Sequence, residues 1–170
     1  RFVNQGGTII ATYGAHKVNL SRRAGLVSTP SDPSLASLLA AWGLSVSDRT
    51  WVADKRNAPF TLPIIQREGR KMRQWVAELD YPLFPEIRVE NAETPHPTLQ
   101  GLAPLTSPWS SPVTWNPQKN PDLKQTTLLR SSEETYSLAS SLLIPDPEAY
   151  PETGFPSADE TGSQPLLMMV

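Results

Sequence analysis

The sequence predicts an α/β fold in which a partial parallel sheet carries a β-rich, proline-rich extension. The first observation is a short apolar, β-branched segment, Thr8–Tyr13, which directly follows two glycines. The second is an amphipathic helix pattern that begins at Asp32 and leads to another apolar segment, Thr50–Asp54. The third is a series of short strand-like segments among the prolines that follow. Because a strand–helix–strand order usually joins parallel neighbours, we expect the two apolar segments to pair in parallel.

The expected first strand is Thr8–Tyr13, because its nearly continuous apolar and β-branched residues are typical of a strand buried on both faces. Gly6 and Gly7 precede it and favour the end of a helix, since glycine readily adopts the left-handed conformation of a helix C-cap. Gly14 is expected to end the strand. The polar and basic residues 15–31 predict a long loop.

The expected helix begins at Asp32, whose side chain can accept a hydrogen bond from the first helical turn. Pro33 fits the first helical position, where the missing N–H would have no partner within the helix. Gly43 is expected to end the helix, and Thr50–Asp54 is the predicted second strand. Apolar residues at helical spacing provide the face that packs on the sheet: Leu35, Leu38, Leu39 and Trp42.

Beyond Arg56 the sequence predicts short strands rather than helices. Gln74–Leu79 is expected to be a strand because X-Pro pairs follow it closely, and residues before proline favour extended backbone. The proline-rich stretch 94–121 is expected to form loops with short edge strands. Thr126–Leu129 is predicted as a further buried strand.

We expect three segments along the chain. Residues 1–143 are predicted to form the α/β domain, excised from a longer chain. Residues 144–165 are rich in proline and acidic side chains and hold few apolar ones, which predicts a linker or long loop. Residues 166–170 form an apolar run that ends without a turn signal, and we expect them to be the start of a further strand.

Composition excludes several classes of function. The 170 residues contain no cysteine, which rules out disulfides, thiolate metal sites and cysteine nucleophiles. The net charge of −2 gives no general attraction to nucleic acid or to an anionic membrane surface. The sequence has no G-x-x-x-x-G-K-[ST] motif, so ATP binding through a P-loop is not expected. We also expect no cofactor and no metal site, since His16 and His96 lack metal-ligand spacing.

A ligand crevice is expected where the predicted parallel strands end, because loops diverge at the carboxyl ends of strands in open α/β sheets. In such a crevice an aromatic ring can stack on a ligand, a glycine lets it approach the backbone, and polar side chains bond it. The alternative is that His16 and Asp54 only cap loops. The candidate ligand-binding residues are Tyr13, Gly14, His16, Asp54, Ser131 and Ser132.

The residues alone leave two other functions possible, a carbohydrate module and a hydrolase. Trp109 and Trp115 lie among prolines and serines, which suits either a platform for sugar stacking or two rings that fasten the loop to the sheet. The first reading predicts a carbohydrate-binding or carbohydrate-processing module. Ser131 and Ser132 could also serve a hydrolase, but no G-x-S-x-G motif or nearby histidine accompanies them.

The order of several segments resembles the auxiliary component of ABC transporters linked to gliding motility. Residues 1–11 resemble that family's opening of helix, two glycines and apolar strand. Residues 38–44, LLAAWGL, are similar to its L-L-x-x-W-G-hydrophobic helix end, and residues 50–54 to its V-x-D strand. Further similar segments are His96–Thr98, Leu102, Pro108–Pro112 and Leu128–Ser132. The resemblance covers residues 1–140 in the family's order.

This resemblance implies a fold and a setting. The fold would be Rossmann-like, related in shape to class I glutamine amidotransferases, and the chain would lack their cysteine nucleophile. The resemblance therefore implies a non-catalytic module rather than an enzyme. It also implies an extracytoplasmic, periplasmic domain of an inner-membrane protein, anchored by transmembrane helices outside this sequence. The implied partners are an ABC permease and its ATPase, with the cargo and any ligand left open.

Overall fold

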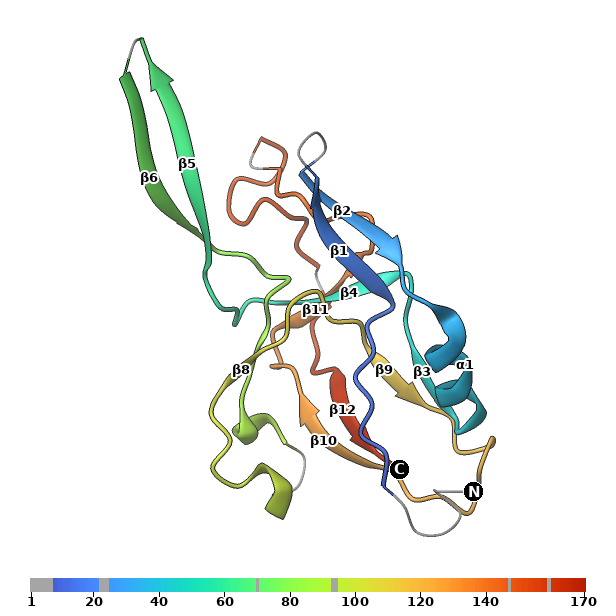
Figure 1. Ribbon diagram of the computed structural model, residues 1–170. Helices are drawn as coiled ribbons and strands as arrows, with labels where there is room; N and C mark the ends of the chain where they lie inside the picture. Colours follow the sequence, from blue (N-terminus) through green and yellow to red (C-terminus); the bar gives the residue numbers. More distant parts are fainter. Residues whose placement is uncertain (1–7, 22–24, 70, 93–94, 147, 159) are drawn as a thin grey trace.

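The computed structural model describes residues 8–21, 25–69, 71–92, 95–146, 148–158 and 160–170. Over these ranges the chain is β-rich, with one short α-helix and strands arranged as small two-stranded sheets whose pairs are all antiparallel (Figure 1). The predicted Rossmann-like partial parallel sheet, with its likeness to class I glutamine amidotransferases, is therefore wrong. In the described ranges no helix has the length and apolar character needed to cross a membrane.

The amino-terminal part differs most from the prediction. Thr8–Tyr13 is not a strand, and Ile10 is 90% exposed. The helix end expected before Gly7 lies outside the described residues. Where a loop was expected, β1 (His16–Ser21) and β2 (Gly25–Pro30) form an antiparallel hairpin. Apolar residues alternate with polar ones in β1, which suits a strand with one solvated face better than a strand in a parallel sheet.

The predicted helix is confirmed as α1 (Pro33–Ala41). The Asp32 side chain accepts a hydrogen bond from the Ser34 backbone N–H at 2.7 Å, and Pro33 occupies the first turn. Trp42 caps the carboxyl end, and Gly43 follows with a φ of 92°. Of the predicted apolar face, Leu39 is buried, whereas Leu38 is 45% exposed. The helix therefore covers less core than a helix of an α/β sheet would.

The predicted second strand is confirmed as β4 (Thr50–Asp54), but its neighbours are not those expected. One edge pairs antiparallel with β11 (Thr135–Ala139). At the other edge, backbone N–H groups of β4 donate to the carbonyls of Ser110 and Pro82, at 2.7 and 2.9 Å. Proline-rich segments thus occupy the place of a parallel neighbour, because a carbonyl can accept from a strand edge without belonging to a strand. This is the physical reason that the parallel prediction fails.

The remaining elements are short, apart from one long hairpin. That hairpin pairs β5 (Phe60–Glu68) with β6 (Lys71–Leu79), which confirms the strand predicted at Gln74–Leu79. Strand β10 (Thr126–Arg130) confirms the buried strand predicted there, and it pairs with β12 (Pro165–Met169). The other elements are β3 (Leu44–Val46), β7 (Glu86–Ile87), η2 (Val89–Asn91), η3 (Pro97–Leu99), β8 (Leu105–Thr106) and β9 (Val113–Trp115).

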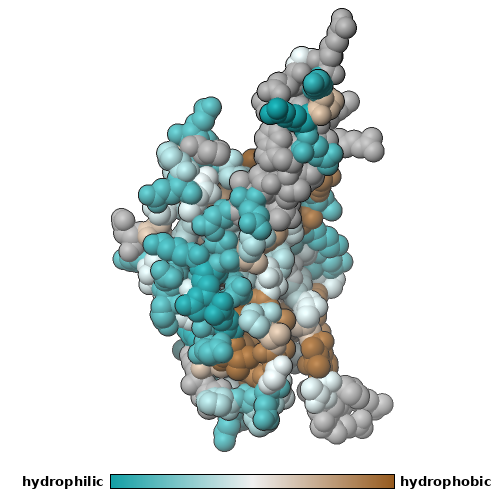
Figure 2. Space-filling model, turned by 90° about the vertical axis from the view of Figure 1, so that its left-hand side faces the viewer, coloured by the Kyte–Doolittle hydropathy of each residue, from teal (hydrophilic) through white to brown (hydrophobic). Residues whose placement is uncertain are grey.

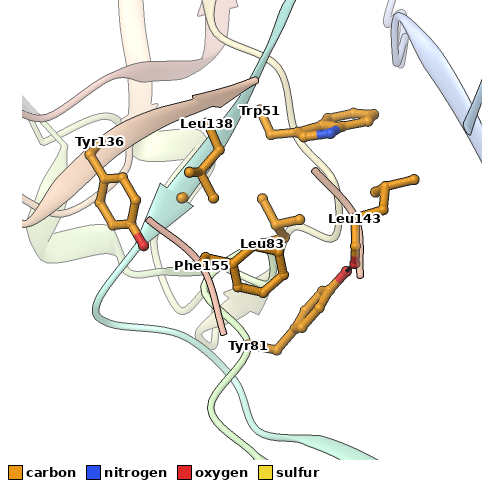
Figure 3. Packing of buried hydrophobic residues seen from close by; sticks show 8 residues of the cluster. Trp51, Tyr81, Leu83, Tyr136, Leu138, Leu143 and Phe155 are labelled. Carbon is orange, nitrogen blue, oxygen red and sulfur yellow. Dashed lines mark hydrogen bonds between the residues drawn. The ribbon is translucent and has the colours of Figure 1, made fainter. Parts of the chain in front are cut away.

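The main core forms where β4 and β11 meet the loops around them (Figure 3). Trp51 and Leu83 are fully buried, and the Tyr81 hydroxyl donates to the Leu143 carbonyl at 2.7 Å. Phe155 packs edge-on against Tyr81 with ring centroids 5.5 Å apart, so the segment after residue 144 contributes to this core. A smaller cluster lies between β10 and the segment around η2 and η3: Ile87, Leu99, Leu128 and Leu129.

Candidate functional site

Asp54 organises the turn between β10 and β11. It is fully buried at the end of β4, and its carboxyl oxygens accept from the Ser132 N–H and hydroxyl at 2.8 and 2.6 Å. The Thr135 hydroxyl donates to it at 2.8 Å, and so does the Arg56 N–H at 2.8 Å. With four donors around it, this side chain is a structural acceptor that faces no solvent. The alternative in which Asp54 caps a loop matches this geometry.

A polar pocket of about 500 Å³ lies beside this turn. Three chain segments form it: the end of β10, the short helix η2, and the segment just before β12. Its walls carry two acidic residues, one arginine and several neutral polar groups. The lining residues are Glu90, Asn91, Ala92, Arg130, Ser131, Glu133 and Ser163.

Hydrogen bonds fix the walls of the pocket. The Arg130 guanidinium donates to the hydroxyl and the carbonyl of Ser163, each at 3.0 Å. The Ser163 hydroxyl donates to the Ser131 carbonyl at 2.9 Å. Ser131 is 1% exposed, and its hydroxyl accepts from the Gln164 N–H at 2.8 Å. These contacts hold Arg130 and Ser131 in place before any ligand arrives, which reduces the entropy lost on binding.

The charges of the pocket indicate what it can bind. Arg130 offers a cationic group, and Glu90 and Glu133 offer carboxylates at the other walls. Asn91 and Ser163 add groups that can donate or accept hydrogen bonds. A pocket with both signs of charge and few apolar walls suits a polar or zwitterionic group, such as a polar segment of another protein. Across the part of the chain that the structure describes, no cluster of His, Asp and Glu is placed to hold a metal ion.

The predicted crevice residues do not gather at one place. Ser131 lines the pocket, and Ser132 lies behind it on Asp54. His16 lies at the start of β1, where its ring is 5.1 Å from that of Trp51. Tyr13 and Gly14 precede it in the irregular segment. Among the described residues, no hydrogen bond or ring contact joins Tyr13, Gly14 or His16 to Asp54.

The two tryptophans proposed as a sugar platform are engaged in packing. The Trp109 ring lies edge-on to Phe84 at 5.0 Å, and its Nε1–H donates to the Tyr81 hydroxyl at 3.2 Å. Its backbone N–H donates to the Leu83 carbonyl at 2.8 Å. Trp115 lies on β9, and its ring closely approaches Gly43. The reading in which Trp109 fastens the proline-rich loop fits these contacts.

Sequence reasoning did not identify most of the pocket. Glu90, Asn91 and Ser163 come from segments far from Ser131 in the sequence, and no motif joins them. The only local signal was the pair of serines at the end of the predicted buried strand. The other residues are brought to the pocket by long-range contacts, which spacing in one sequence does not reveal.

Comparison with protein families gives one match. Residues 1–168 match the family described as an ABC-type uncharacterized transport system, and the matching family is that of its auxiliary component. Neither the curated proteins nor the solved structures include a match. The matched range contains every residue of the pocket and nearly all of the elements described above.

Proposed function

The chain belongs to the family of auxiliary components of an ABC-type uncharacterized transport system, and from that membership we propose that it is a non-catalytic extracytoplasmic module that contacts the permease or its cargo. The family match over residues 1–168 is the observation that carries this proposal. Membership in such a family implies association with transporter subunits. The contact surface that we propose is the polar pocket at the end of β10.

The chemistry of the pocket supports a binding role. The Ser131 hydroxyl is occupied by the Gln164 backbone, from which it accepts at 2.8 Å. The lining residues include no histidine that could serve this serine as a general base. Arg130 is held by two hydrogen bonds to Ser163, so it presents a fixed positive group beside the two glutamates. A fixed, polar, mixed-charge surface favours recognition of a polar partner segment.

The proposed setting follows from the earlier resemblance. We place the module on the extracytoplasmic side, in a protein anchored by transmembrane segments outside this sequence. A permease then provides the membrane channel and a separate ATPase provides the energy. The sequence contains no P-loop motif, which agrees with a division of labour in which another subunit binds ATP.

Co-purification tests the proposal. The full-length protein is expressed together with the permease and ATPase of a transport system of this family, and an affinity tag on the permease is used to recover the complex. Glu90→Arg reverses one charge at an exposed pocket wall, and Glu152→Arg makes the same change at an exposed site outside the pocket. We expect wild type and Glu152→Arg to be recovered with the permease. Recovery of Glu90→Arg should fall about tenfold or more, because reversing a charge in a complementary interface weakens binding and a tenfold loss is about 1.4 kcal/mol.

Two outcomes contradict the proposal. Equal recovery of Glu90→Arg and wild type would show that the pocket is not the contact surface. Absence of the permease from every sample, together with glycan-array binding that is lost on Trp109→Ala, would replace transport with the carbohydrate module. Circular dichroism of each variant shows whether the fold is retained.

A further inference from the structure

The longest hairpin in the described part of the chain extends away from the other elements. Strands β5 and β6 pair over nine residues each, and Figure 1 shows them reaching out from the body as a separate arm. Nine extended residues span about 30 Å. A two-stranded hairpin with no covering layer is only marginally stable in water. A long arm of this kind therefore suits a surface that covers one of its faces.

The register of the arm makes one of its faces more apolar than the other. Cross-strand partners in an antiparallel pair share a face, and alternate residues share it along each strand. The pairs Phe60–Leu79, Leu62–Ala77 and Ile64–Trp75 therefore occupy one face in the half of the arm nearest the body. The opposite face mixes the polar residues Thr61, Gln74 and Glu78 with the apolar residues Pro63, Ile65 and Val76. The backbone thus places an apolar stripe on one side of the arm.

The far end of the arm is basic. Residues 67–73 include four basic residues and one acidic residue, a local charge of +3. Because the whole chain carries −2, the other residues together carry −5. Lys71 and Arg73 are exposed, and Figure 2 shows strongly hydrophilic residues on the projecting arm. The chain as a whole does not attract anions, but this end of the arm does.

We propose that the β5–β6 hairpin binds the surface of an anionic lipid bilayer. An amphipathic element lies in the interface with its apolar face toward the acyl chains, and its basic residues meet lipid phosphates. Each basic residue near such a surface contributes about 1 kcal/mol. A second copy of the arm would cover the apolar stripe but would bring another basic end rather than the opposite charge. The inference uses family membership only to place the protein near a membrane and needs no contact with the permease.

Vesicle sedimentation with the full chain tests the proposal without any transporter subunit. The probes are vesicles of phosphatidylglycerol and phosphatidylcholine in a one-to-two ratio, and vesicles of phosphatidylcholine alone. We expect binding to the anionic vesicles only, weakened by added salt. The double variant Lys71→Glu/Arg73→Glu should lose binding tenfold or more. The matched control Lys119→Glu/Lys124→Glu changes the net charge equally, at exposed positions on the body, and should bind like wild type.

A second readout locates the contact. Hydrogen exchange of the backbone amides in residues 60–79 should slow on anionic vesicles, while exchange in β1 and β2 stays unchanged. Equal loss of binding in both charge variants would overturn the proposal, because it would indicate a general charge effect. Binding to neutral vesicles as strongly as to anionic ones, no binding to either, or self-association of the chain through residues 60–79 would overturn it as well.

Discussion

At the scale of single residues, the buried carboxyl group of Asp54 links the core to the candidate pocket. It accepts hydrogen bonds from Ser132, Thr135 and Arg56, and these bonds set the path of the chain between β10 and β11. Arg130 and Ser131 lie immediately before that turn and line the pocket. The sequence identified Asp54 as a polar residue at a strand end, which was correct. The sequence could not show that Ser132 and Thr135, at the start of β11, would enclose the Asp54 carboxyl group.

Replacing Asp54 should destabilise the protein strongly. Asp54→Ala leaves the Ser132 N–H and the Thr135 hydroxyl buried without their acceptor, which should lower the free energy of unfolding by about 3 kcal/mol. Chemical denaturation measures this loss. Asp48→Ala, a change outside this hydrogen-bond network, should leave the midpoint near that of wild type. A midpoint of Asp54→Ala equal to that of the control would contradict the structural role.

Buried tyrosines give a pH dependence in alkaline solution. Burial raises the pKa of Tyr136 above its ordinary value of 10.0, and the negative charges of Asp80 and Asp54 raise it further. Burial also raises the pKa of Tyr81, against a weaker opposite effect of the hydrogen bond from Trp109. Their contribution to stability is therefore complete below pH 10.0 and is lost as the pH rises through the raised values of the folded state.

The Tyr136→Phe variant should reduce this alkaline loss of stability. The free energy of unfolding of wild type should fall between about pH 9 and pH 11, because the unfolded chain releases the tyrosine protons first. Without the Tyr136 hydroxyl the fall should be shallower. Tyr150 is exposed, so Tyr150→Phe should retain the wild-type slope. Identical slopes for the two variants would show that Tyr136 does not cause the effect.

At the scale of elements, local signals were predicted well and partners were not. Asp32 and Pro33 determine where α1 begins, because both act within one turn of the chain. Strand β4 was predicted at its observed bounds because its apolar residues are continuous. The choice of β11 as its neighbour depends on residues more than eighty positions away, and the carbonyls of Ser110 and Pro82 that cover its other edge carry no sequence signal.

Two other segments have a structure that differs from the one their sequence patterns predicted. Thr8–Tyr13 has the composition of a buried strand, yet it is irregular and largely exposed. The β1–β2 hairpin was missed although β1 alternates apolar and polar residues, the pattern of a strand with one solvated face. The polar and basic character of residues 15–31 favoured a loop instead.

Gly43 lies where the end of α1 approaches β9, and Gly101, at an open position elsewhere, serves as its control. Gly43 and Gly101 both have positive φ, 92° and 75°. A Cβ at Gly43 would lie 2.7 Å from the Asn116 carbonyl oxygen and 3.0 Å from the Trp115 ring, whereas nothing lies within 4 Å at Gly101. Gly101→Ala should cost about 1 kcal/mol for its backbone conformation alone. Gly43→Ala should cost more, about 3 kcal/mol, because the close contacts add to the backbone strain.

Thermal unfolding compares the two glycine variants directly. The melting temperature should fall clearly further for Gly43→Ala than for Gly101→Ala. Equal shifts would mean that the approach of β9 to the end of α1 is looser than the structure shows. Far-UV circular dichroism before heating confirms that both variants fold.

At the scale of the whole molecule, the sequence predicted the family correctly and the fold incorrectly. The match over residues 1–168 confirms that the chain belongs to the family of auxiliary components of an ABC-type transport system, and the link to gliding motility stays a prediction. The Rossmann-like sheet that the same resemblance implied is wrong, because the described chain is built from small antiparallel pairs. Short motifs in the right order can identify a family, since each is local. Sheet topology depends on contacts between distant segments, which the motifs do not record.

The central functional proposal is that the pocket at the end of β10 contacts the permease or its cargo. Site-specific photocrosslinking in cells that hold the complete transport system tests this contact most directly. A photoreactive amino acid is placed at Glu90, at the pocket wall, and in a parallel strain at Glu152, away from it. We expect a crosslink from position 90 to the permease or to the transported cargo, and no such crosslink from position 152. Crosslinks of equal yield from both positions, or none from position 90 while the transport system is assembled, would contradict it.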